Sequence, residues 1–182
     1  MEASSLYIRC NLNPAAYQAA MSAPVANPRQ FDDWQCWYDS KDAYGPGELP
    51  AEDLDRTASC SLSDLIEGWV EFSAGNSSHY DEQAGVWTFA VLEFTDNYGE
   101  MLQLLAPLRQ LAHYAEVDSD SFLVILPYIW GGDINACLSL GQGRSVFIDG
   151  PSEAQRAEAD AALEQQWDRA ASAYEQEGLK FD

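Results

Sequence analysis

VWTFAVLEF (86–94) and SFLVILPYIW (121–130), joined by TDNYGEMLQLLAPLRQLAHYAE (95–116), decide the fold of this chain. The two apolar runs have the length of buried strands, and the segment between them repeats its apolar residues at helical spacing. Two shorter runs, DINACLSL (133–140) and SVFI (145–148), predict two further strands. A helical crossover between parallel strands, followed by strands that return through glycine turns, predicts a mixed, mainly antiparallel sheet.

The helix expected within 95–116 carries its own boundary signals. Asn97 followed by Glu100 predicts a capping box at its start. Pro107 interrupts the pattern, and because proline lacks the backbone N–H of a helix interior, a kink or two short helices are expected.

The chain before this unit supplies a first strand and two helices. SLYIRCNL (5–12) alternates as a strand does, and Asn13 before a proline predicts the start of a short helix. SLSDLIEGWVEFS (61–73) has one apolar stripe and one acidic stripe. An amphipathic helix is therefore expected there, capped by Ser61 or Ser63.

The C-terminal part predicts one long helix, whereas the polar stretch GNSSHYDEQAG (75–85) predicts a loop. Residues 151–178 are rich in Ala, Glu and Gln, begin with Pro151 and end with Gly178. Together the elements predict one α+β domain over 1–182, with four to five strands packed by helices. The side chains of the long helix expected to face the sheet are Ala159, Ala162, Leu163, Trp167, Ala170 and Tyr174.

Length and composition fit a folded protein of one domain. The chain has 182 residues, 47% of them hydrophobic and 12% aromatic, which is enough apolar surface for a core. Its apolar runs are too short to span a bilayer, and MEASSLYIRCNL at the N-terminus lacks the basic and apolar regions of a secretion signal. A cytoplasmic protein without membrane contact is therefore expected.

Negative charge is the strongest global property. The net charge is −21, and residues 31–100 hold sixteen acids against Lys41 and Arg56. Such a surface repels nucleic acid and anionic lipid and attracts basic proteins. Acidity also keeps a cytosolic protein soluble, but solubility does not require the charge to be concentrated in one region.

Residues that carry catalysis or bind metal ions are sparse. The two histidines, His79 and His113, have no cysteine at zinc-ligand spacing, and no calcium loop, phosphate loop or nucleophile elbow occurs. Cys60 with His79, or one of the acid pairs, keeps a small hydrolase or a metal-binding protein open as an alternative. Neither catalytic residues nor a cofactor or metal are predicted, and the four scattered cysteines are expected to be reduced.

The segment FDDWQCWYDSKD (31–42) interleaves acids with aromatic residues. One interpretation is a loop pinned to the body by buried Trp34 and Trp37, with its acids in water. The other is a partner-binding surface, because interface hot spots favour Trp and Tyr within a polar rim. Under the second interpretation the helix 61–73 and the loop 75–85 extend the surface. The predicted partner-binding residues are Asp32, Asp33, Trp34, Trp37, Tyr38, Asp39, Asp42, Tyr44, Asp64, Glu67, Glu71, Tyr80, Asp81 and Glu82.

With FDDWQCWYDSKD, DLIEGWVEF (64–72) and YDEQAGVW (80–87), the chain resembles the bacterial immunity proteins that neutralise interbacterial toxins. The resemblance implies tight, stoichiometric binding at or near the active site of a basic protein toxin. Without an export signal the two proteins would meet in the cytoplasm, so a toxin that acts on nucleic acids or nucleotides is expected. A second hypothesis rests on the same charge: a phage or mobile-element protein that mimics nucleic acid and inhibits a defence nuclease.

Overall fold

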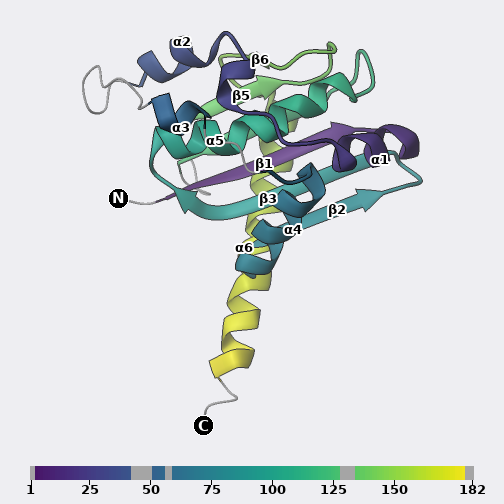
Figure 1. Ribbon diagram of the computed structural model, residues 1–182. Coiled ribbons are helices and arrows are strands. Elements are labelled where there is room, and N and C mark those ends of the chain that lie inside the picture. Colours follow the sequence, from purple (N-terminus) through teal and green to yellow (C-terminus); the bar gives the residue numbers. More distant parts are fainter. Residues whose placement is uncertain (1–2, 42–50, 56–58, 128–133, 179–182) are drawn as a thin grey trace.

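The computed structural model describes residues 3–41, 51–55, 59–127 and 134–178. Its centre is a six-stranded sheet in the order β2-β3-β1-β4-β5-β6 (Figure 1), one strand more than the upper expectation. The predicted α+β architecture with a long C-terminal helix is confirmed. The strands are β1 (Ser4–Asn11), β2 (Asn76–Asp81), β3 (Val86–Thr95), β4 (Phe122–Leu126), β5 (Ala136–Ser139) and β6 (Val146–Phe147). The helices are α1 (Pro14–Ser22), η1 (Pro28–Gln30), α2 (Trp34–Asp39), α3 (Ala51–Asp55), α4 (Leu62–Phe72), α5 (Tyr98–Arg109), η2 (Gln110–His113) and α6 (Glu153–Gly178).

β1 lies between the two strands of the predicted crossover. β3 and β4 run in the same direction, because each pairs with β1 in antiparallel register: Leu6 lies opposite Val91 on one side and Ile125 on the other. α5 connects these two strands, so the strand–helix–strand unit is present with β1 inserted in it. Among the described strands, each neighbouring pair is antiparallel.

Residues 75–85, predicted as a loop, form β2 and the turn into β3. His79 of β2 pairs with Thr88 of β3, at the edge of the sheet. The prediction is wrong because it required apolar alternation, whereas β2 has mostly polar side chains. Its pairing with the apolar β3 makes this segment a strand.

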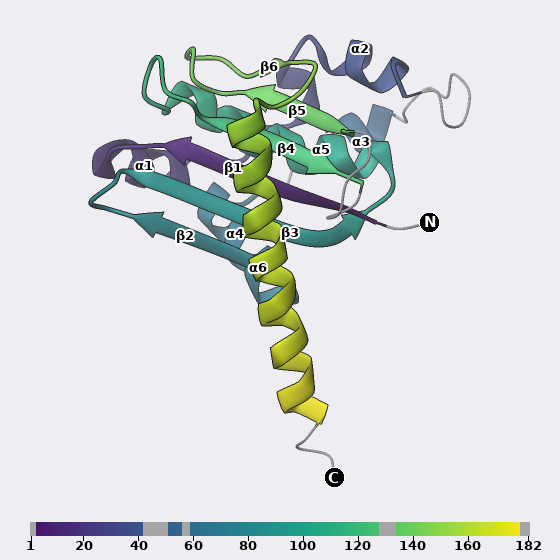
Figure 2. The same cartoon turned by 180° about the vertical axis from the view of Figure 1, so that it is seen from behind.

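Helices cover both faces of the sheet (Figures 1 and 2). α1, α2, α4 and α5 lie on one face, where the alternate residues Leu6 and Ile8 of β1 enter the larger core. α6 crosses the other face, where Tyr7 joins Ala159 and Leu163 in a second core, as the predicted helix face requires. The last turns of α6 extend beyond the sheet (Figure 2), so Tyr174 is 59% exposed instead of facing it.

The local sequence at two helix starts predicts the caps correctly. The Asn13 side chain accepts a hydrogen bond from the backbone of Ala16 and caps α1. Ser61, and not Ser63, caps α4, where it forms a capping box with Asp64.

α6 begins later than its proline predicts. Ser152 and Gln155 exchange side-chain-to-backbone hydrogen bonds, and this reciprocal pair starts the helix at Glu153. Pro151 therefore precedes the helix and does not open it.

Only half of the capping box predicted for α5 forms. Asn97 accepts hydrogen bonds from the backbone of Gly99 and Glu100, but the Glu100 side chain accepts from the Thr95 hydroxyl. α5 continues through Pro107 and ends at Arg109. The 3₁₀-helix η2 follows directly, so the helical stretch consists of two segments that meet shortly after the proline. None of the described helices is both long enough and apolar enough to cross a lipid bilayer.

Candidate functional site

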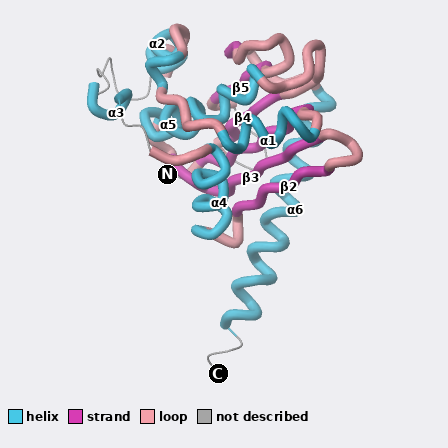
Figure 3. Tube along the Cα trace, turned by 45° about the vertical axis from the view of Figure 1, so that its right-hand side comes forward, coloured by secondary structure: helices cyan, strands magenta, loops and turns pink. Residues whose placement is uncertain are grey.

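The predicted partner-binding residues lie in two separate areas. Those of 32–39 lie on or next to α2, beside β5 and β6, whereas those of 64–71 lie on α4 and those of 80–82 lie at the end of β2 and the start of the following turn (Figures 1 and 3). α5 lies between the two areas. Asp42 and Tyr44 lie outside the described residues.

α2 is attached to the body through Trp37. This side chain is 7% exposed, its indole N–H donates to the Asn135 carbonyl at 3.0 Å, and its ring stacks on Phe147 at 5.6 Å between centroids. Trp34 and Tyr38 are half-buried and pack against the same core. The burial of Trp37 therefore fits the interpretation of a segment that is pinned to the body of the protein, and the side chains of Asp32 and Asp39 face solvent.

Asp33 also belongs to this attachment. Its carboxylate lies 2.7 Å from the guanidinium of Arg109, a side chain that is only 3% exposed. The guanidinium carbon of Arg109 lies 4.3 Å from the centre of the Phe31 ring and 4.7 Å from that of Phe147. Burial lowers the pKa of Arg109 and the charge of Asp33 opposes that shift. Asp33 is thus occupied by an internal ion pair.

Acidic residues and tyrosines meet on the other side of α5. A hollow of about 480 Å³ lies between α1, α4 and β2, and Tyr17, Glu67 and Glu71 line it. The Tyr17 ring stacks on Tyr80 with centroids 3.9 Å apart. The exposed Asp81 ends β2, and the exposed Glu82 begins the turn into β3. We call this the acid–tyrosine surface, and its residues are Tyr17, Glu67, Glu71, Tyr80, Asp81 and Glu82.

The carboxylates of the acid–tyrosine surface face solvent. Glu67, Glu71, Asp81 and Glu82 are exposed, and none of them forms an ion pair with a lysine or arginine in the described ranges. Their field acts on the two phenols, because burial and Glu67 raise the pKa of Tyr17.

The same field acts at Tyr80. Partial burial, Glu82 and Asp81 are among the causes that raise the pKa of this phenol. The Tyr80 hydroxyl donates to the Leu12 carbonyl at 2.8 Å, which fixes the ring beneath Tyr17. Both rings therefore stay protonated and in place beside uncompensated negative charge.

An aromatic groove, which the sequence did not predict, lies on the other flank of α4. It is a hollow of about 340 Å³ formed by the end of α4, the end of β3 and the second half of α6. Phe72 is 82% exposed, although its ring meets Trp69 edge to face at 6.5 Å. The aromatic groove is lined by Trp69, Phe72, Leu92, Phe94, Trp167 and Tyr174 among others.

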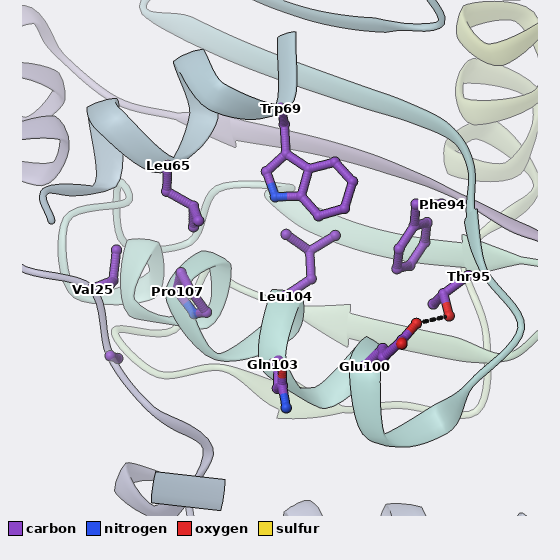
Figure 4. A pocket seen from close by; sticks show the side chains of 10 residues that line it. Val25, Leu65, Trp69, Phe94, Thr95, Glu100, Gln103, Leu104 and Pro107 are labelled. Carbon is purple, nitrogen blue, oxygen red and sulfur yellow. Dashed lines mark hydrogen bonds between the residues drawn. The ribbon is translucent and has the colours of Figure 1, made fainter. Parts of the chain in front are cut away.

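Trp69 also forms a wall of a second hollow, of about 450 Å³, between α4 and α5. In Figure 4 the side chains of Trp69, Leu65 and Leu104 converge on it, and Phe94 closes one side. Glu100, hydrogen-bonded to Thr95, is a polar group at its edge. α4 is therefore a wall with a carboxylate-lined hollow on one flank and aromatic hollows on the other.

The residues considered for catalysis are dispersed. Cys60 is half-buried just before α4, His79 is exposed on β2, and His113 is exposed at the end of η2. The described residues contain no group of three His, Cys, Asp or Glu side chains that could hold a metal ion. All four cysteines are free, and burial raises the pKa of Cys10 and of Cys137 to about 12, which keeps these two thiols protonated.

Comparisons of the chain with protein-family models, with curated proteins and with solved structures found no match. The surfaces around α4 are therefore the basis on which a function is inferred.

Proposed function

We propose that this chain is an immunity-type inhibitor: it binds a basic bacterial toxin in the cytoplasm and blocks the toxin's action on nucleic acids or nucleotides. The observation that carries the proposal is the acid–tyrosine surface, where four exposed carboxylates surround two stacked phenol rings. A toxin that grips phosphate groups presents lysines and arginines in its cleft, and a carboxylate surface complements them.

The physical state of these groups supports capture of such a partner. Unpaired carboxylates attract a basic protein over several ångströms, which raises the association rate, particularly at low salt. Tyr17 and Tyr80 hold one another rigid, so ordering them on binding costs little side-chain entropy. Rigid aromatic groups within a polar rim are typical of interface hot spots.

The nucleic-acid mimic remains the second hypothesis, since the same charge would attract a defence nuclease. It differs in the target, which would be a nuclease of the host rather than a toxin of a competitor.

The proposal is tested with the basic protein encoded beside this chain in its genome. Expression of that neighbour alone should stop growth, co-expression of this chain should restore growth, and the purified pair should form a complex of equal stoichiometry in which the neighbour's activity is lost. A neighbour that is not toxic, or one that stays fully active with this chain in excess, would contradict the proposal.

A further inference from the structure

We propose that the aromatic groove, with the adjoining outer face of α4, binds an amphipathic helix of a basic partner protein. This inference deepens the proposed function and rests on it for the positive charge of the partner. It concerns the opposite flank of α4 from the acid–tyrosine surface, so different side chains test it.

The groove exposes aromatic surface that the chain itself leaves uncovered. Phe72 is 82% exposed and Tyr174 is 59% exposed, and both line the same hollow. Trp69 holds the cluster together, with Phe94 edge to face at 6.2 Å. Exposed apolar patches of this kind mark interaction sites, because burial of each large side chain would stabilise a complex.

A glycine on α4 is the second observation. Gly68 lies in the interior of α4 on its exposed face, where glycine costs about 1 kcal/mol relative to alanine. Its packing does not explain that cost, because a Cβ at Gly68 would meet no heavy atom within 4 Å in the described part of the chain. Gly68 does line a shallow hollow of about 390 Å³ with Trp69 and Phe72. The missing side chain allows the backbone of another helix to approach α4 closely.

The third observation is backbone strain at Glu93. This residue has φ 46°, a left-handed conformation that is unfavourable for a side chain other than glycine. It lies in an irregularity of β3, where the three residues between Val91 and Thr95 face the single residue Ser5 of β1. Leu92 and Phe94, on either side of Glu93, both line the aromatic groove. Bulges that re-aim side chains are common next to functional sites.

Charge selects the occupant. Asp64 lines the shallow hollow beside Gly68, where the capping hydrogen bonds from Ser61 lower its pKa, and Glu93 lines the groove. Apolar residues flanked by lysine or arginine complement an aromatic groove with these carboxylates. A second copy of this chain, with net charge −21, would be repelled.

The test uses three synthetic helical peptides of about 18 residues, roughly five turns each. The first has a leucine stripe and lysines on the polar face, the second keeps the leucines but has glutamates, and the third keeps the lysines but replaces leucine by serine. Titration calorimetry at about 0.15 M salt, where long-range attraction between exposed charges is screened, should detect one binding site for the leucine–lysine peptide. The other two should bind at least about tenfold more weakly.

Protein variants assign that site to the groove. Phe72→Ser should weaken binding of the leucine–lysine peptide about tenfold or more, since Phe72 would be the most exposed anchor. Val117→Ser is the matched control, because Val117 is another large exposed apolar residue, at 72%, in the loop after η2. It should change binding less than about twofold. Gly68→Gln should weaken binding, because the added side chain keeps the peptide away from the backbone of α4. The same substitution should raise the melting temperature, because glutamine favours a helix more than glycine does.

Equal losses in Phe72→Ser and Val117→Ser, or equal binding of the leucine–lysine and serine–lysine peptides, would overturn the inference. Sedimentation of the unliganded protein as a dimer that Phe72→Ser dissociates would also overturn it, in favour of a second copy. These peptides involve no toxin, so failure here is distinct from failure of the growth-rescue test.

Discussion

Arg109 links α2 to the rest of the molecule through its contacts with Phe31, Asp33, Ser145 and Phe147. The interpretation of Asp33 as a partner-binding residue therefore competes with a structural role. A charge reversal at Asp33 would leave the buried guanidinium of Arg109 without its counter-charge. A loss of binding in such a variant would not distinguish a lost partner contact from a disturbed fold.

Arg109→Ala is expected to lower the free energy of unfolding by about 2–4 kcal/mol, because it opens a cavity and leaves Asp33 without its ion pair. Urea denaturation measures the change. Arg144→Ala, which alters an exposed arginine, is the control and should stay within about 0.5 kcal/mol. A loss in Arg109→Ala as small as that of Arg144→Ala would show that the contacts seen around Arg109 contribute little.

Sequence predicts single residues well where the relevant physics is local. Asn13 and Ser61 cap their helices as expected, because each cap needs only the backbone within one turn. Glu93 could not be predicted, since its left-handed backbone results from the pairing of β3 with β1 and not from a glycine or asparagine in the sequence. The ion pair of Asp33 with Arg109 joins positions far apart in the chain, and nothing in the spacing indicates it.

Among the elements, α4 organises the candidate site because it separates the acid–tyrosine surface from the aromatic groove. Its start depends on the capping box of Ser61 and Asp64. Asp64 was predicted to contact a partner, but hydrogen bonds from the Ser61 hydroxyl and backbone already use its carboxylate and lower its pKa.

Ser61→Ala should lower stability by about 1 kcal/mol at neutral pH, the usual effect of losing a helix cap. Because the pKa of Asp64 is lower in the folded state, the contribution of its ionised form is present above the unfolded pKa of about 3.9 and is lost as the pH falls through the lowered folded value. Asp64→Asn should therefore show a smaller loss of stability on acidification below about pH 4 than the parent chain, in urea titrations across that range. Identical pH profiles for the two proteins would contradict the assigned role of Asp64.

The elements themselves were predictable to different degrees. α4 and α6 follow from helical periodicity and composition, and β1, β3 and β4 from their apolar runs. β2 was missed because its strand conformation depends on the partner strand rather than on its own polar sequence. The aromatic groove needs α4, β3 and α6 to meet, so its residues are spread over 69–174 and share no sequence pattern.

At the scale of the whole molecule, the uneven charge read from the sequence is a surface property. Within residues 31–100, each described acidic side chain is exposed except that of Asp33, which is half-buried. The sequence did not indicate that α5 separates the carboxylates near α2 from those near α4. Only the second group adjoins a hollow together with stacked tyrosines, and this is why the proposed interface is assigned there.

The central claim is that the acid–tyrosine surface captures a basic partner, and the association rate constant tests it most directly. The measurement is stopped-flow mixing with the basic neighbour-encoded protein, comparing the double variant Glu67→Lys/Glu71→Lys with Glu164→Lys/Asp168→Lys, an equal charge change at exposed positions of α6. The first variant should associate about tenfold more slowly at low salt, with the difference shrinking as salt is added, and the second should lose far less. Equal rate losses in the two variants would mean that only net charge matters, and would contradict a specific interface beside α4.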